Sequence, residues 1–260
     1  MTLPPLTPGE DSIHIWSIAL HASVELERAF EETLSNHENL RRQGFANSTL
    51  RRRFTLSHGV LRVLLSRYLD TSPEQIVFGY GLAGKPFVEN DRAWIQFNAS
   101  HSDDLAVYAF GSKRRLGVDI ERIRSMPDLN GVAKLFFNKN ECAEILSLEE
   151  AERTEAFFRC WTRKEAYLKA VGCGFSVAPE SFEVSLRPEQ PAALRSLPLD
   201  DACRSWKIHD IARSDYAGAV VFDGADCAIE CKPVCAAEDL ADSLVRRRDL
   251  FGGIAKHFEP

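Results

Sequence analysis

Residues Phe157 to Lys169 read FFRCWTRKEAYLK, a stretch that places one acid between two lysines on an expected helix. Glu165 and Lys169 are four residues apart, so a helix stacks them on one face, with Lys164 beside them. Taken alone, this pattern is also that of an ordinary surface ion pair on a solvated helix.

A second segment, Gly117-Val118-Asp119-Ile120-Glu121, precedes this helix and has the pattern of a strand. Successive side chains leave opposite faces of a strand, so Asp119 and Glu121 share one face while Val118 and Ile120 point into the core. Alone, the two acids would be read as solvent-side residues of a half-exposed strand. Together with the helix, they indicate a site to which both segments contribute.

Asp119, Glu121 and Glu165 supply three carboxylates that can converge on one point. Carboxylates about 5 Å apart repel by roughly 3 kcal/mol per pair at an effective dielectric near 20. A hard divalent cation removes that repulsion, and ligands that are all oxygen favour magnesium or manganese over zinc. Because lysines flank the acids, the expected substrate is an anion such as a phosphate ester. The pattern predicts phosphoryl-transfer chemistry.

The composition is that of a soluble globular protein, with 260 residues, 45% hydrophobic and 27% charged. A net charge of −6 argues against general binding to nucleic acid. No apolar run reaches the roughly 18 residues of a membrane helix, and the N-terminus does not resemble a signal peptide. With 7 cysteines, an odd number, reduced thiols and a cytoplasmic location are expected.

The second half of the chain echoes the first. Ser72–Phe78 resembles Ala178–Val184, and Ser102–Phe110 resembles Ser214–Phe222, in the same order. We therefore predict an internal duplication with an α+β fold, in which residues 1–114 and 115–260 each place a long helix on a small, mostly antiparallel sheet. The site is expected where the two halves meet.

Hydrophobic periodicity, capping residues and turn residues predict the individual elements. Helices are expected over 24–34, 50–68, 130–137, 139–148, 154–171 and 238–250. Strands are expected over 13–20, 76–80, 94–98, 105–110, 116–121, 181–186, 206–211, 217–222 and 228–231.

Read in order, the motifs resemble those of the 4′-phosphopantetheinyl transferases of the surfactin-synthetase-activating type. They are Gly84-Lys85-Pro86, Phe97-Asn98-Ala99-Ser100-His101-Ser102, the Gly117–Glu121 strand, Trp161-x-x-Lys164-Glu165-Ala166-x-x-Lys169 and Gly172-x-Gly174. The resemblance covers roughly Ile13 to Leu244. It implies a pseudodimer of two α+β halves, with coenzyme A bound between them and a monomeric enzyme.

The resemblance also implies roles for the acids and lysines. Asp119, Glu121 and Glu165 would hold Mg²⁺, or Mn²⁺ in its place, against the diphosphate of coenzyme A. Lys164 and Lys169 would flank that diphosphate. Lys169 would stabilise the leaving oxygen, and Glu165 is the nearest candidate for the base that takes the serine proton.

Further contacts with coenzyme A are implied at the other motifs. Ser100 and His101 would lie against a phosphate, and Lys85 would lie near the adenylate. Arg53 matches the basic residue that contacts the 3′-phosphate, with Arg41 or Arg42 as an assisting residue. One departure is Asp103, where many members have glycine; it adds negative charge close to an anionic ligand.

The implied reaction moves the 4′-phosphopantetheine of coenzyme A to a serine of an apo carrier protein and releases adenosine 3′,5′-bisphosphate. Carriers of fatty-acid, polyketide, nonribosomal-peptide and siderophore synthesis all remain open, and a role in secondary metabolism is one expectation. Two other functions also stay open. One is a metal-dependent hydrolase of a nucleotide diphosphate, and the other is a coenzyme A-binding module without catalysis.

Overall fold

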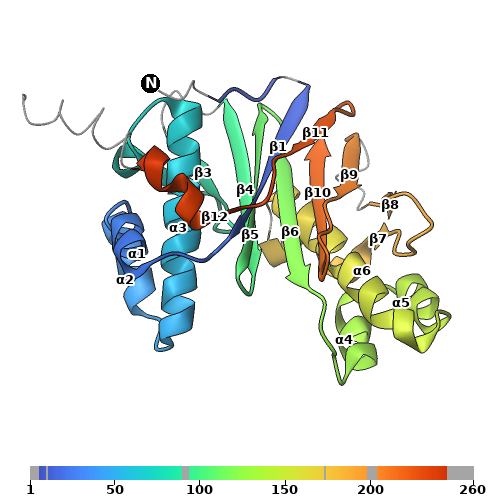
Figure 1. The fold of residues 1–260 in the computed structure, drawn as a ribbon. Helices are drawn as coiled ribbons and strands as arrows, with labels where there is room; N and C mark the ends of the chain where they lie inside the picture. The colour runs from blue at the N-terminus through green and yellow to red at the C-terminus, as the bar shows by residue number, and fades with distance from the viewer. Residues whose placement is uncertain (1–5, 10, 90–93, 173, 198–203, 245–260) are drawn as a thin grey trace, which may run out of the picture.

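The computed structural model describes residues 6–244, apart from residue 10, residues 90–93, residue 173 and residues 198–203. Two β-sheets lie in the middle of the molecule, and helices cover their outer faces (Figure 1). Helix α3 (Ser48–Leu69) covers the first sheet, and helix α6 (Glu150–Val171), of the same 22-residue length, covers the second. The mixed α+β fold predicted from the sequence is confirmed.

The first sheet has the strand order β11-β1-β5-β4, and β12 also pairs with β1. The antiparallel part consists of β1 (Ser12–Ala19), β5 (Leu105–Ser112) and β4 (Ile95–Ser102). The two short strands β11 (Ala228–Cys231) and β12 (Cys235–Ala236) run parallel to β1. Strands close to the two ends of the described chain therefore lie next to each other in the first sheet.

The second sheet has the strand order β6-β10-β9 and is antiparallel throughout. Its strands are β6 (Leu116–Arg122), β10 (Tyr216–Asp223) and β9 (Trp206–Asp210). Both β4 and β6 are the last strand on one side of their sheets. The two sheets therefore meet along two edge strands that have no backbone ladder between them.

Three apolar clusters fill the spaces between the sheets and helices. Because successive side chains of a strand point to opposite faces, neighbouring residues of one strand belong to different clusters. In β5, Tyr108 and Phe110 face α3, while Val107 and Ala109 face the second sheet. In β6, Val118 and Ile120 belong to the cluster between the sheets, as predicted. The intervening residues of β6, including Asp119, therefore face α6.

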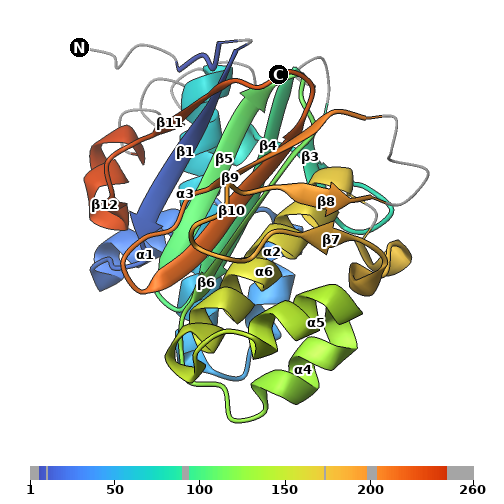
Figure 2. The same cartoon turned by 90° about the vertical axis from the view of Figure 1, so that its right-hand side faces the viewer.

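The smaller elements lie around this frame. Helices α1 (Val24–Glu31) and α2 (Asn36–Gln43) lie beside α3, whereas α4 (Leu129–Phe136) and α5 (Lys139–Leu146) lie beside α6 (Figure 2). Two small two-stranded sheets are formed by β2 (Phe78–Tyr80) with β3 (Pro86–Val88) and by β7 (Glu183–Val184) with β8 (Leu194–Ser196). Single 3₁₀ turns occur at Pro73–Gln75, Gly174–Ser176, Pro179–Ser181 and Ala237–Leu240. None of the helices in the described ranges is long and apolar enough to cross a membrane.

Most predicted elements are present, with ends that differ by a few residues. Helix α2 was not predicted because its residues are mainly polar, although Ser35 and Glu38 form a capping box at its start. The predicted helix over 238–250 begins as a 3₁₀ turn, and its last residues lie outside the described ranges.

The close approach of α6 to β6 depends on Gly117. A Cβ atom at this position would lie 2.2 Å from the carbonyl oxygen of Ala166 and 2.3 Å from the amide nitrogen of Ala170. Both atoms belong to the backbone of α6, so they cannot move aside as a flexible side chain could. Gly117 therefore lets the helix that carries Glu165 and Lys169 pack directly on the strand that carries Asp119.

We expect Gly117→Ala to lower the free energy of unfolding by roughly 3 kcal/mol, because the added methyl forces α6 away from β6. Denaturant unfolding measures this change. Gly81→Ala is the control, because its nearest neighbour would be an ordinary contact at 3.7 Å. Equal stability of the two variants would contradict the packing argument.

Candidate active site

Side-chain hydrogen bonds from alternate residues of β4 join the two edge strands. The bonds run from the backbone N–H of Val118 to Asn98 Oδ1 (2.8 Å), from Ser100 Oγ to Asp119 Oδ1 (2.7 Å) and from Ser102 Oγ to Glu121 Oε2 (2.7 Å). Because alternate residues share one face of a strand, three polar residues of β4 reach β6 together. The carboxylates of Asp119 and Glu121 are thus held by serines from the other sheet.

Helix α6 brings a cation to the same place. Lys169 Nζ donates to Asp119 Oδ1 at 2.6 Å and to Ser100 Oγ at 3.1 Å. Asp119 is only 3% exposed, and its Oδ2 atom is buried with no hydrogen-bond partner among the described residues. One oxygen of this carboxylate is therefore satisfied by lysine and serine, while the other has an unused lone pair.

These side chains line an open cavity of about 480 Å³ at the seam between the sheets. Its lining residues are Ala99, Ser100, His101, Asp119, Glu121, Trp161, Glu165 and Lys169. The structure thus brings together six residues that the sequence predicted as a site: the three acids, Lys169, Ser100 and His101.

The electrostatics show that the three acids influence one another. Burial, followed by the charge of Asp119, raises the pKa of Glu165, and the charge of Glu121 contributes in the same direction. Burial also raises the pKa of Glu121, again with a contribution from Asp119. The cavity is therefore a region where negative charge is unfavourable without a cation.

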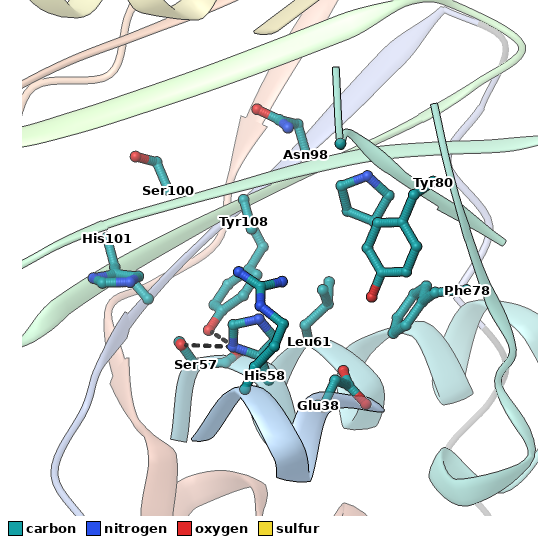
Figure 3. A pocket seen from close by; sticks show the side chains of 15 residues that line it. Glu38, Ser57, His58, Leu61, Phe78, Tyr80, Asn98, Ser100, His101 and Tyr108 are labelled. Atoms are coloured by element: carbon teal, nitrogen blue, oxygen red, sulfur yellow. Dashed lines mark hydrogen bonds between the residues drawn. The ribbon is translucent and has the colours of Figure 1, made fainter. Parts of the chain in front are cut away.

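A second cavity, of about 250 Å³, shares Ala99, Ser100 and His101 with the first and is lined by residues of α3 (Figure 3). Ser57, His58 and Leu61 from α3 form one wall, and Phe78 and Tyr80 from β2 form another, as Figure 3 shows. Burial lowers the pKa of His58 to about 4, so this imidazole is neutral at physiological pH. Its Nδ1 lies 3.0 Å from the carbonyl oxygen of Phe54, which leaves Nε2 as an acceptor.

A third cavity, of about 210 Å³, adjoins the other two. It shares Gly84 and Asn98 with the second cavity, and Glu165 and Lys169 with the first. Lys85 lines it and donates to the carbonyl oxygen of Leu116 at 2.7 Å, and burial lowers the pKa of Lys85 to about 8. Each of the three cavities therefore has residues of β4 or α6 in common with another.

Comparisons with known proteins agree with this chemistry. Residues 115–221, which carry the three acids and Lys169, match the family model of the 4′-phosphopantetheinyl transferase superfamily. The 4′-phosphopantetheinyl transferase HetI of Nostoc sp. is 37% identical over 221 residues, covering 84% of this chain and 90% of that protein. The chain belongs to the 4′-phosphopantetheinyl transferase superfamily.

The chain is also similar to a second named transferase and, more distantly, to a solved structure. The 4′-phosphopantetheinyl transferase Sfp of Bacillus subtilis is 33% identical over 171 residues, covering 61% of this chain and 75% of that protein. A crystal structure of a holo-(acyl-carrier-protein) synthase from Bacillus anthracis covers 42% of this chain and 93% of its own, with 22% identity and a TM-score of 0.36. As a member of the superfamily, this transferase moves 4′-phosphopantetheine from coenzyme A to a carrier protein.

The transferase does not present a closed metal cage. Within the described part of the chain, no three acidic, histidine or cysteine side chains lie close enough together to hold a metal ion. Lys169 instead supplies the positive charge beside Asp119. Two features nevertheless fit a bound dication. It would coordinate the unused Oδ2 of Asp119, and its positive charge would stabilise the ionised forms of Glu121 and Glu165, whose pKa values are raised.

Lys164 of the transferase lies away from the cavity, contrary to the role at the diphosphate that we expected. Its ammonium lies 2.8 Å from Glu141 Oε2, with side-chain exposures of 3% and 0%. It also donates to the carbonyl oxygens of Pro179 at 2.8 Å and Phe182 at 2.7 Å. All three donors are therefore used inside the C-terminal half, and the residue is structural.

The N-terminal half contains a matching arrangement. Arg62 of α3 pairs with Glu38 at 2.7 Å and donates to the carbonyl oxygens of Pro73 and Ile76, both at 2.9 Å. Glu38 and Glu141 also have the same local position: each is the third residue of a short helix and forms a capping box with the residue before that helix. The same buried cation, acid and two carbonyls thus recur in both halves, which supports the internal duplication predicted from the sequence.

The basic residues expected at the adenylate end have different placements in the transferase. Arg41 lines the second cavity, whereas Arg42 pairs with Glu31. Arg53 is 22% exposed and pairs with Asp104 at 2.9 Å and with Asp103 at 3.6 Å. Of the two alternatives left open, Arg41 is therefore the one beside a cavity.

Sequence reasoning did not identify Ser102 or Asn98 as part of the site. The signal was present, because Asn98, Ser100 and Ser102 are spaced by two residues in one strand and must share a face. Trp161, the first residue of the helical motif, has neighbours both in the core and at the site. It stacks on Phe157 with ring centroids 6.2 Å apart, and it also lines the cavity of the three acids.

Proposed function

We propose that this enzyme is a Mg²⁺-dependent transferase of the surfactin-synthetase-activating type, with its reaction centre at the seam between β4 and β6. The observation that carries the proposal is the meeting of Asp119, Glu121, Glu165 and Lys169 around one cavity. We further propose a cytoplasmic monomer that modifies a serine on an apo carrier of fatty-acid, polyketide or nonribosomal-peptide synthesis.

Asp119, Glu121 and Glu165 would hold the metal. When bound, Mg²⁺ would offset the charge of the coenzyme A diphosphate and act as a Lewis acid. Ser100 and Ser102 orient two of these carboxylates by hydrogen bonds of 2.7 Å. Because phosphoryl transfer depends mainly on positioning and charge, these serines contribute by keeping the acids in place.

Lys169 is proposed to donate to the leaving oxygen of coenzyme A. Its contacts with Asp119 and Ser100 hold its ammonium at the cavity wall in the absence of substrate. Burial and the neighbouring carboxylates raise the pKa of Glu165, which makes it a stronger base than an ordinary glutamate, and it is the proposed acceptor of the serine proton. Its position on the same helix face as Lys169 places the two groups at one reaction centre.

The remaining contacts with coenzyme A are proposed along β4. His101 lines the cavity of the three acids, and partial burial and then the charges of Lys169 and Arg53 lower its pKa. Arg53 is assigned to the 3′-phosphate, Arg41 to the same end of the molecule, and Lys85 to the adenylate. The cavities that share Gly84 and Asn98 give the ligand a continuous course.

We propose that an internal duplication accounts for a single site in one chain, with residues 1–114 and 115–260 as a pseudodimer in which α3 and α6 are equivalent. The exchange between the halves is that β11 and β12 of the second half complete the first sheet. Aligning Arg62 with Lys164 places Val63, which is 0% exposed, at the position of Glu165. The N-terminal half thus lacks the helical carboxylate, and only the C-terminal half can complete an acidic site.

Incubation with coenzyme A, Mg²⁺ and an apo carrier protein tests this function. A carrier that gains the mass of one phosphopantetheine group, with release of adenosine 3′,5′-bisphosphate, supports it. Release of the bisphosphate without that mass gain indicates a hydrolase instead. Tight binding of coenzyme A without either product indicates a binding module.

A further inference from the structure

The turn between β4 and β5 consists of Asp103 and Asp104. Asp103 has a φ of +49°, a left-handed conformation that favours glycine and is next best accepted by asparagine and aspartate. An aspartate can therefore stand at this position with little backbone strain, and it adds a carboxylate beside the site. Asp104 has no such constraint, because among the described residues it is not one of those with positive φ.

The two carboxylates contact different atoms of Arg53. Asp104 Oδ1 accepts from Arg53 Nε at 2.9 Å, a hydrogen bond that fixes the plane of the guanidinium. Asp103 Oδ1 lies 3.6 Å from Arg53 Nη1, and Asp103 Oδ2 lies 3.3 Å from Arg122 Nη1. Asp104 therefore holds the inner nitrogen, while Asp103 sits opposite a terminal nitrogen that an anionic ligand would use.

Arg53 is not among the lining residues of the three cavities, but it lies near His101, which lines the first and second. Its charge acts on His101 together with that of Lys169. Its side chain is 22% exposed, and that of Asp103 is 27% exposed, so solvent screens their attraction only in part. A phosphate approaching this region meets an arginine whose outer nitrogen already faces a carboxylate.

We propose that Asp103 is a specificity-determining residue that competes with the 3′-phosphate of coenzyme A for Arg53, whereas Asp104 is a positioning residue for the same guanidinium. This inference rests on the proposed function, in which Arg53 contacts that phosphate. Removal of Asp103 strengthens the preference for coenzyme A over 3′-dephospho-coenzyme A. Removal of Asp104 weakens it, because the arginine is then free to turn away.

The test compares kcat/KM for coenzyme A and for 3′-dephospho-coenzyme A, with one apo carrier and constant Mg²⁺. Asp103→Asn removes the charge and keeps a side chain that accepts the left-handed conformation. We expect it to raise the preference for coenzyme A two- to fivefold, the range of a partly exposed ion pair. Asp104→Ala is expected to lower the preference by about the same factor.

Binding of adenosine 3′,5′-bisphosphate and of adenosine 5′-monophosphate gives a readout that does not depend on the carrier. Asp103→Asn should tighten binding of the bisphosphate and leave binding of the monophosphate unchanged. Asp103→Gly, which also accepts a positive φ, should reproduce the effect if Asp103→Asn folds poorly. Equal changes for both nucleotides, no change, or weaker bisphosphate binding would overturn the role of Asp103.

Arg53→Gln separates failure of this inference from failure of the proposed function. If Arg53→Gln lowers the preference for coenzyme A but Asp103→Asn does not raise it, the competition is wrong and the phosphate contact stands. If Arg53→Gln leaves the preference unchanged, the assignment of Arg53 to the 3′-phosphate is wrong, and the role of Asp103 falls with it. Neither result bears on whether the unaltered enzyme modifies a carrier protein, which the mass measurement tests separately.

Discussion

Glu165→Gln is expected to lower carrier modification by roughly 10²- to 10³-fold, because it removes a proposed metal ligand and the candidate base together. The same substitution is expected to stabilise the metal-free protein. Burial and the charges of Asp119 and Glu121 raise the pKa of Glu165, so its ionised form is less favourable in the folded state than in the unfolded state.

The sign of the pH dependence follows from linkage. Because its folded-state pKa is raised, Glu165 binds its proton more tightly in the folded protein, and its destabilising effect grows as the pH rises through that pKa. Glutamine removes this effect. The gain in stability should be largest at alkaline pH, where Glu165 is ionised in both states, and should vanish when the pH falls below about 4.5.

Thermal unfolding with and without Mg²⁺ checks this prediction alongside the activity assay. The unaltered enzyme should gain Tm on addition of Mg²⁺, and Glu165→Gln should start from a higher Tm and gain little. Glu152→Gln, at an exposed glutamate in the first turn of α6, is the matched control and should keep full activity. A Glu165→Gln variant that retains activity would remove Glu165 from the proposed mechanism.

Lys164→Ala is expected to lower the free energy of unfolding by about 3–5 kcal/mol, the usual range when one partner of a buried ion pair is removed. Glu141 is 0% exposed, so its carboxylate would remain buried without a cation. Two backbone carbonyls, those of Pro179 and Phe182, would also lose their donor. Such a loss is a large part of the stability of an ordinary domain.

Denaturant unfolding measures this loss, and a double variant provides the control. Lys164→Met with Glu141→Leu leaves no unpaired buried charge and should recover part of the stability. Recovery is incomplete because the carbonyls of Pro179 and Phe182 still lack their donor. Coenzyme A binding at low temperature distinguishes the two possible roles of Lys164. Unchanged binding by the folded fraction agrees with a structural residue, whereas loss of binding without loss of stability would restore its place at the diphosphate.

Helix geometry shows why Lys164 was misplaced. Glu165 and Lys169 are one turn apart and share a face, but Lys164 precedes Glu165 directly and so points about 100° away. The motif contains both lysines, and the resemblance therefore implied a common role. Arg62, whose contacts in α3 match those of Lys164, shows that this position serves the fold in both halves.

Local patterns in the sequence determined much of this protein. Alternation placed Val118 and Ile120 in the core and Asp119 on the opposite face, because a strand has a period of two. The four-residue spacing of Glu165 and Lys169 put both at one cavity for the corresponding helical reason. These two spacings were enough to predict the site residues on β6 and α6, and the repeats and hydrophobic periodicity of the chain predicted the α+β fold.

Only the tertiary structure decided how the two halves meet. The seam joins β4 to β6 through side-chain bonds of Asn98, Ser100 and Ser102, and no periodicity in one strand specifies which residues of another strand it faces. The pairing of Arg53 with Asp103 and Asp104 likewise joins a helix to a distant turn. Short-range spacing sets the direction of a side chain, whereas its partner depends on packing between segments far apart in the chain, which local propensity does not encode.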